Sequence, residues 1–185
     1  LTLNTNPAYM PPLKGRDGEA DERARKQGGL QAAKLDHWGK TLVDCGIRGK
    51  RQMIVDASGE SGAPLLVAIH EQVRAKPSVD AEAQPAEFEW SLPLDNKDGE
   101  LAVDGNRFTL TKGGASLQGI VVGADALGGD AAARVADGEV LVVFTLQQGE
   151  GEATQGRTEG TSGQPVVSVG GRTVQVRDGE LQIAD

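Results

Sequence analysis

Residues 87–122 carry the feature that most restricts the fold, an alternation of apolar and polar side chains. It passes through Phe88, Glu89 and Trp90, and each run stops at a glycine-containing turn such as residues 104–105. A period of two residues places successive side chains on opposite faces of a strand, and such turns join strands into hairpins. The stretch therefore predicts a β-meander in the middle of a β-sandwich, with its aromatic side chains in the core.

Further apolar runs predict strands on both sides of this meander. Residues 65–69 are continuously apolar, which favours a central strand covered on both faces. Residues 123–129 are rich in Gly, Ala and Asp, and we expect them to cross from one sheet to another. The other expected strands are 41–45 and 51–56, which a turn at 46–50 would join, then 139–146, 165–169, 172–176 and 180–183. The last three would form a meander through two-residue turns at 170–171 and 178–179.

The expected fold class is all-β, an antiparallel β-sandwich of hairpins and meanders with an irregular N-terminal arm. A chain of 185 residues suits one such domain, and its 3% aromatic content leaves most of the core to Val, Leu and Ile. Pro7, Pro11 and Pro12 favour extended backbone near the start of the chain. We therefore divide the chain into an extended, charged arm at residues 1–39 and a β-sandwich domain at residues 40–185.

The charge is distributed unevenly along the chain. Residues 1–51 hold ten Lys and Arg against six Asp and Glu, whereas residues 52–185 hold nine against twenty-one. A basic arm on an acidic body favours contact with an acidic partner or with another copy of the chain. Nucleic acid is not an expected partner, because no dense basic cluster with interleaved aromatics is present. No apolar run approaches the length of a membrane span.

The sequence contains little that predicts catalysis or a cofactor. The single Cys45 excludes a disulfide framework, and two histidines do not make an imidazole metal site. No nucleophile elbow or phosphate-binding glycine motif is present, so we expect no metal, no cofactor and no catalysis by this chain alone. His70 lies in an apolar strand, where a hydrogen-bonded imidazole is expected. Asp36, His37 and Trp38 form the densest polar-aromatic cluster, in which Trp38 would stack on a sugar ring or plug the core.

Several segments of the β-region resemble the β-sandwich of heparinase II/III-like proteins. The resemblance is carried in order by residues 51–69, 89–93, 104–110, 113–117, 140–145 and 169–174, and it covers roughly residues 40–184. It implies a secreted, cell-surface or periplasmic module associated with polysaccharide lyases of acidic glycans. In that family a helical toroid precedes the sandwich and supplies much of the catalytic machinery, and this chain has no counterpart of the toroid. Tyr9, the only tyrosine, lies in the arm.

Three functional hypotheses follow. The first is a non-catalytic extracellular module that contacts an acidic polysaccharide or a partner domain, with Asp36, His37 and Trp38 as carbohydrate-contacting residues. The second is a self-assembling, filament-type subunit, a homo-oligomer whose arm, through Leu1, Leu3 and Tyr9, adds a strand to a neighbour's sheet. The third is a fragment of a polysaccharide lyase. The chain begins at Leu1 rather than Met, and the simplest interpretation is a processed or excised segment.

Overall fold

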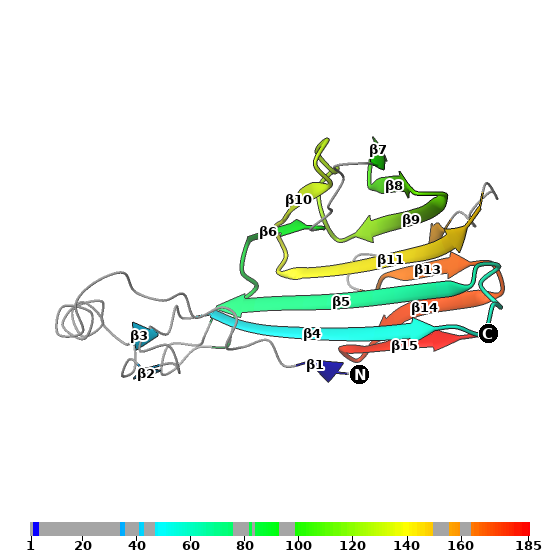
Figure 1. Cartoon of the computed structure of the whole chain (residues 1–185). Coiled ribbons are helices and arrows are strands. Elements are labelled where there is room, and N and C mark those ends of the chain that lie inside the picture. Colours follow the sequence, from blue (N-terminus) through cyan, green and yellow to red (C-terminus); the bar gives the residue numbers. More distant parts are fainter. Residues whose placement is uncertain are drawn as a thin grey trace.

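The protein is described by a computed structural model, which has the all-β, antiparallel sandwich architecture expected from the sequence (Figure 1). The structure describes residues 47–75, 82, 84–92, 99–149, 156–159 and 164–185. It also describes the backbone of three two-residue strands, β1 (Thr2–Leu3), β2 (Lys34–Leu35) and β3 (Thr41–Leu42). No helix occurs in these segments, and so none of them holds an apolar helix of membrane-spanning length. The proposed boundary between residues 39 and 40 lies outside them and stays a prediction.

The largest element is a seven-stranded antiparallel sheet in the order β1-β4-β5-β11-β9-β8-β7. Its central strands are the two most apolar segments of the sequence, because burial on both faces requires a nearly continuous apolar run. The strands not yet given bounds are β4 (Ile47–Asp56), β5 (Leu65–Ala75), β7 (Gly99–Asp104), β8 (Arg107–Lys112), β9 (Ala115–Val122) and β11 (Glu139–Gln148). The predicted central position of residues 65–69 is thus confirmed.

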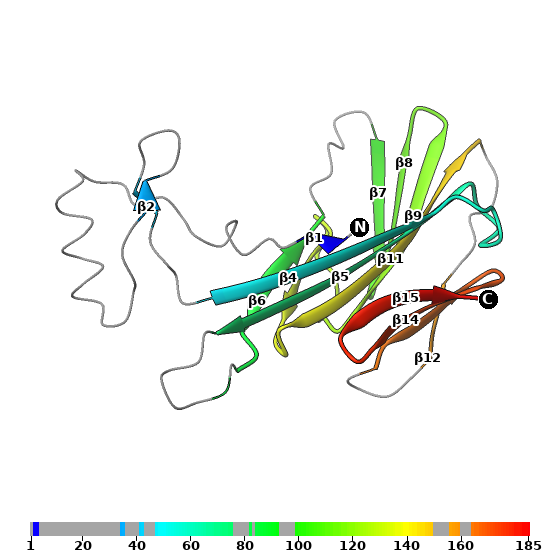
Figure 2. The same cartoon turned by 90° about the horizontal axis from the view of Figure 1, so that it is seen from below.

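A four-stranded sheet in the order β12-β13-β14-β15 packs against one face of the large sheet (Figures 1 and 2). Its strands are β12 (Arg157–Glu159), β13 (Val166–Val169), β14 (Arg172–Arg177) and β15 (Glu180–Ala184). The predicted C-terminal meander is confirmed, and Asp178 and Gly179 adopt positive φ angles of 52° and 73° at its last turn. Between the two sheets lies a core of aliphatic side chains that includes Leu66, Leu141 and Val174.

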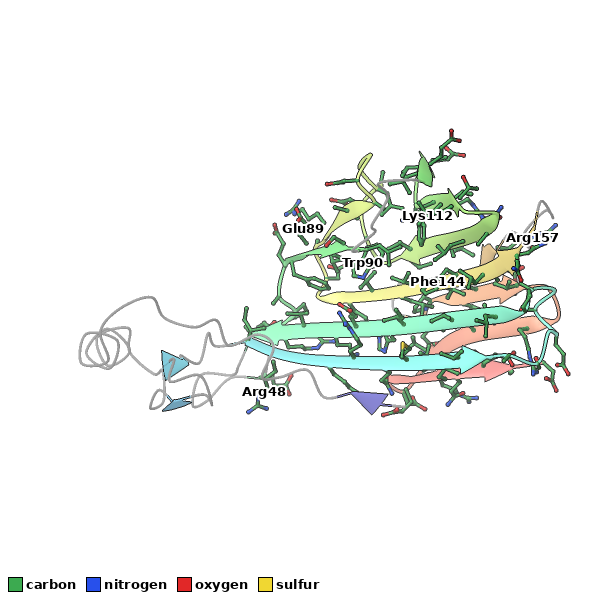
Figure 3. The ribbon with its side chains drawn as sticks, viewed as in Figure 1. Arg48, Glu89, Trp90, Lys112, Phe144 and Arg157 are labelled. Carbon is green, nitrogen blue, oxygen red and sulfur yellow. The ribbon has the colours of Figure 1, made fainter. Side chains whose placement is uncertain are left out.

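A two-stranded sheet of β6 (Phe88–Ser91) and β10 (Ala132–Val135) covers part of the opposite face. Trp90, which Figure 3 labels, and Phe108 are buried in this second core, as the sequence predicted. Phe108 lies over Gly119 on the neighbouring strand β9, where a side chain would overlap its ring. The glycine is therefore part of the packing, since it makes the space that the aromatic ring fills.

Two predicted strand pairings are wrong, that of the hairpin around residues 46–50 and that of the first strand of the meander. Residues 46–50 were expected to turn, but Ile47–Asp56 is one continuous strand that pairs with β5 over all ten residues. The predicted meander also begins later, because β6 leaves the large sheet to pair with β10, and only β7, β8 and β9 follow one another. The expected sheet change over residues 123–129 is confirmed, since they connect β9 to β10.

The first strand lies at the edge of the large sheet. In β1, Thr2 pairs with Gln52 and Leu3 with Arg51, antiparallel to β4 (Figure 2). These are two of the ten positions of β4, and the described segments place no other strand along this side of it. An N-terminal segment of this chain therefore adds a strand to a sheet edge, in this structure to its own sheet.

Candidate functional site

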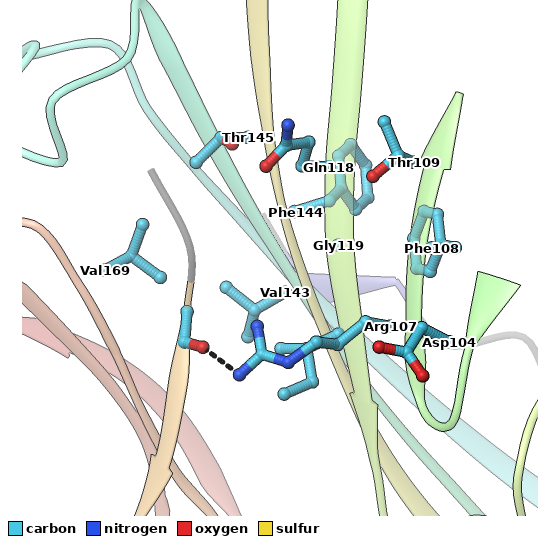
Figure 4. A pocket seen from close by; sticks show the side chains of 12 residues that line it. Asp104, Arg107, Phe108, Thr109, Gln118, Gly119, Val143, Phe144, Thr145 and Val169 are labelled. Atoms are coloured by element: carbon cyan, nitrogen blue, oxygen red, sulfur yellow. Dashed lines mark hydrogen bonds between the residues drawn. The ribbon is translucent and has the colours of Figure 1, made fainter. Parts of the chain in front are cut away.

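A row of polar side chains crosses three strands of the large sheet on the face that carries the four-stranded sheet. Thr109 of β8 pairs with Gln118 of β9, which in turn pairs with Thr145 of β11. Paired residues of antiparallel strands point to the same face with their Cβ atoms about 5 Å apart. The three side chains thus form a continuous line of hydroxyl and amide groups, which Figure 4 shows side by side.

This polar row forms one wall of a pocket of about 200 Å³. Gly156, immediately before β12, and Val169 of β13 contribute from the small sheet, while Ile120 and Val143 contribute apolar surface from the large one. Because a water molecule occupies about 30 Å³ in the liquid, the volume corresponds to roughly six or seven waters. It is smaller than a drug-sized site and suits a ligand of one small ring.

Arg107 crosses the other side of the pocket (Figure 4). Its Nη2 donates a hydrogen bond to the backbone carbonyl of Gly156, which ties β8 to the segment that enters β12. That bond uses one of the five N–H groups of a guanidinium, so the planar fork retains donors for an anionic ligand. Asp104 of β7 also lines the pocket and pairs with Arg107 across the strands. The described lining of the pocket therefore contains one cation and one carboxylate among uncharged groups.

The Thr145 hydroxyl is the most informative group in the pocket. Thr145 is 1% exposed, and its Oγ1 has no hydrogen-bond partner among the residues that the structure describes. A buried hydroxyl without a partner costs about 1–3 kcal/mol, and Val would fill the same volume without that cost. Val143, two residues before Thr145 on the same face of β11, shows that this strand accommodates a valine beside the pocket. An unsatisfied polar group at a pocket wall is a feature of ligand sites.

A second polar cluster joins the two sheets at the middle of β4 and β5. Its centre is His70, which is 1% exposed. His70 Nδ1 lies 3.1 Å from Gln52 Oε1, and Nε2 lies 2.7 Å from Glu139 Oε1. Gln52 Nε2 donates to Glu180 of β15, and Lys50 Nζ lies 2.9 Å from the same carboxylate. The predicted hydrogen-bonded state of His70 is confirmed.

The carboxylates of this cluster are stabilised in their charged form. The hydrogen bond from His70 lowers the pKa of Glu139 below its ordinary value, with Gln72 and Arg74 acting in the same direction against partial burial. The hydrogen bond from Lys50 lowers the pKa of Glu180, and Gln52 adds to that effect. The cluster connects β4, β5 and β11 of the large sheet to β15 of the small one. Because its imidazole is buried, the cluster has a structural role, which is to hold the two sheets together.

Arg172 organises a third polar group, next to the C-terminus. Its guanidinium donates to Asp56 Oδ2 at 2.9 Å and lies 2.9 Å from a carboxylate oxygen of Glu60. The backbone N–H of Ser58 lowers the pKa of Asp56, and Arg172 acts in the same direction. These contacts attach the loop after β4 to the start of β14, which is a structural role.

The side chains of the sequence-predicted site residues lie outside the part of the chain that the structure describes. Asp36, His37 and Trp38 lie outside the residues that the structure describes, as do Leu1, Tyr9 and Cys45; of Leu3 only the backbone in β1 is described. Glu87 and Glu89 are exposed as expected, and Glu87 forms an ion pair with Arg134 that lowers its pKa. In the described segments no three His, Cys, Asp or Glu residues gather where a metal would bind.

Sequence reasoning missed the pocket, although one signal for it was present. Gln118 and Thr145 stand at inward positions of strands whose neighbouring inward positions are Ile120 and Val143. Polar groups at such positions mark sites where burial is incomplete or functional. What the sequence could not indicate is that Arg107 and Gly156, 49 residues apart, meet across the pocket.

Comparison with known proteins does not place the chain in a family. No family model matches the sequence, and neither a curated protein nor a solved structure matches it.

Proposed function

We propose that this protein is a non-catalytic β-sandwich module that holds a carboxylate-bearing sugar unit of an acidic polysaccharide in the pocket between β8, β9, β11 and β12. The observation that carries the proposal is the buried Thr145 hydroxyl, which lines the pocket and has no hydrogen-bond partner in the described part of the chain. A ligand hydroxyl would satisfy it, because a threonine hydroxyl both donates and accepts hydrogen bonds.

The remaining groups of the pocket fit the same chemistry. Thr109 and Gln118 offer further hydroxyl and amide groups beside Thr145, and Arg107 offers a planar fork that matches a carboxylate. Ile120 and Val143 present apolar surface to the carbon skeleton of a sugar. Among the described residues that line the pocket, Asp104 is the only acidic one, so these residues supply no pair of carboxylates at glycosidase spacing. Binding without bond cleavage is therefore the simplest activity.

The resemblance to the β-sandwich of heparinase II/III-like proteins supports an acidic polysaccharide as the ligand and an extracellular location. The same resemblance supports contact with a partner domain. On this proposal Asp36, His37 and Trp38 supply a further sugar contact.

The test is a titration with glucuronate, galacturonate and their oligosaccharides. Isothermal calorimetry measures the affinity, and NMR shifts of the Thr145 methyl group report whether the ligand reaches the pocket. We expect millimolar or tighter binding that Thr145→Val abolishes while the protein keeps its fold. Thr173→Val, on β14 outside the pocket, is the matched control and leaves binding unchanged. Wild-type protein that binds none of these ligands at high millimolar concentration would overturn the proposal, as would full affinity in Thr145→Val.

A second candidate function is self-assembly by strand exchange, and the pairing of β1 with β4 favours it. Thr2 and Leu3 already form an edge strand, so the same backbone pairing is available to β4 of another copy. A basic arm and an acidic body would add electrostatic attraction between copies.

Light scattering over a concentration series tests this candidate. Self-assembly predicts a mass that rises with concentration and a monomer after deletion of residues 1–3, whereas Thr2→Val, which keeps strand propensity, assembles like wild type. A wild-type chain that stays monomeric throughout the series would exclude it.

A further inference from the structure

Two apolar rows cross the large sheet on the face that carries β6 and β10. In the first, the leucine row, a leucine stands at each paired position of five neighbouring strands, in the order Leu65, Leu146, Leu117, Leu110 and Leu101. The second apolar row runs two residues away along each strand and includes Val67, Phe144 and Phe108. Residues two apart on a strand point to the same face, and Phe108 belongs to the core beneath β6 and β10. Both rows therefore lie on that face.

The described strands cover one end of this face. β6 and β10 pack over the start of β11, at Val140 and Val142, and Figure 1 shows them at that end of the sheet. Among the described residues, the exposed large apolar side chains are Val55, which is 53% exposed, and Leu146, which is 38% exposed. Leu146 belongs to the leucine row, and Val55 pairs with Val67 and so continues the second row onto β4. Apolar exposure in the described part of the chain is thus concentrated on these two rows.

Neither row contains a charged residue, although the chain has a net charge of −8. In a two-fold contact a patch meets its own copy, so a charge near the axis faces a like charge. These rows avoid that repulsion. They also offer no charge by which a different partner could be selected, since electrostatic complementarity is a main source of specificity. A second copy of this chain is therefore the occupant that the face fits.

The shape of the face also suits a second copy. Two sheet faces pack about 10 Å apart with interdigitating side chains, and an identical face has the same strand spacing. Five strands about 4.8 Å apart and two rows about 7 Å apart give roughly 340 Å² of apolar surface on each copy. A stable interface buries about 800 Å² on each partner, so we expect a weak contact, with a Kd on the order of 100 μM.

We infer that the leucine row and the second apolar row form the interface of a weak, two-fold symmetric dimer of this chain. A two-fold contact closes on itself, so association stops at the dimer. The pocket stays accessible in this dimer, because Thr145 and Gln118 point to the opposite face of the sheet. The dimer depends neither on sugar binding nor on the pairing of β1 with β4.

Sedimentation equilibrium of the full chain, from about 10 μM to about 1 mM, tests the dimer. The mass of wild type should rise from that of the monomer to that of the dimer and no further. Deletion of residues 1–3 should leave this rise unchanged. A wild-type chain that stays monomeric at about 1 mM would overturn the inference. Loss of the dimer on deletion of residues 1–3 would overturn it too, because it would assign the contact to strand exchange.

Leu110→Lys and Thr111→Lys form a matched pair, because the two residues are adjacent on β8 and point to opposite faces. Both changes reduce the net negative charge by one, which weakens the general repulsion between copies. Leu110→Lys, and Leu146→Lys on β11, should raise the Kd about tenfold or more, since each places a cation in an apolar contact. Thr111→Lys should keep the wild-type Kd. Equal dimerisation of the three variants would overturn the inference.

Methyl NMR of wild type locates the contact without any substitution. On dilution through the Kd, the methyl signals of Leu110 and Leu146 should shift together. Leu66, which is buried between the two sheets, should keep its shifts and serves as the control. Concentration-dependent shifts that spare Leu110 and Leu146 would place the contact elsewhere and overturn the inference.

Discussion

His70 and Glu139 face each other across β5 and β11, with Nε2 2.7 Å from Oε1, while the other ring nitrogen of His70 faces Gln52. Both ring nitrogens are directed at oxygen acceptors, and Gln52 is held in its orientation by its bond to Glu180. The buried imidazole therefore connects a strand of one sheet to a strand of the other through a single amide.

The coupling between His70 and Gln52 can be measured by a double-mutant cycle. His70→Leu leaves Gln52 Oε1 buried without a donor and should lower the free energy of unfolding by about 1–3 kcal/mol. Gln52→Leu should have a similar effect, but the double variant should lose less than the sum, because neither partner is then left unsatisfied. Urea unfolding provides the four values. Strict additivity would show that the contact does not couple the two side chains.

The pH dependence of stability should report the Glu139 carboxylate. Its pKa is lowered in the folded protein, so its stabilisation is fully present above the unfolded value of about 4.3 and is lost as the pH falls through the folded value. The unfolding free energy of wild type should therefore decrease more steeply below about pH 4.3 than that of Glu139→Gln. Chemical denaturation between pH 3 and 7 measures both slopes. Glu89→Gln, an exposed change on β6, should retain the wild-type slope, and identical slopes for all three proteins would contradict the assignment.

Gly119→Ala should destabilise the protein, because the added methyl group overlaps the ring of Phe108. Overpacking of a filled core costs about 1–3 kcal/mol. Gly129→Ala, where the new methyl group meets open space, is the control and should change the unfolding free energy little. In the Gly119→Ala background, Phe108→Leu should cost less than it does in wild type, since it relieves the overlap. Thermal unfolding of wild type, the three single variants and the double variant measures these costs. An equal cost of Phe108→Leu in both backgrounds would argue against direct contact between residues 108 and 119.

Thr145→Val should raise stability, the opposite of what most core substitutions do. The valine keeps the volume and removes a buried hydroxyl without a partner, so a gain of about 1 kcal/mol in unfolding free energy is expected. Val143→Thr is the reciprocal control, because it introduces a hydroxyl at another buried position of β11 and should be destabilising. A Thr145→Val protein markedly less stable than wild type would mean that the hydroxyl has a stabilising partner in the free protein.

Local patterns in the sequence determined the secondary structure and much of the core. The alternation around Trp90 and Phe108 predicted which side chains are buried, because side-chain direction along a strand depends only on the position within that strand. The apolar run that begins at Leu65 predicted a central strand for the same reason, since only a strand covered on both faces tolerates it. Asp178 and Gly179 predicted their turn through backbone preferences that need no distant partner.

Tertiary structure alone decided which strands pair and where polar side chains meet. Residues 46–50 contain two glycines and are interpreted from the sequence as a turn, yet residues 47–50 belong to β4, because pairing with β5 along ten residues outweighs a weak local preference. The β6 strand leaves the meander to pair with β10, and Trp90 is buried in the core that this pair covers. The pocket depends on contacts between residues far apart in sequence, Arg107 with Gly156 and Thr145 with Gln118. Alternation along a strand predicts that a side chain faces inward. Only the register with the neighbouring strands determines which other side chains it contacts.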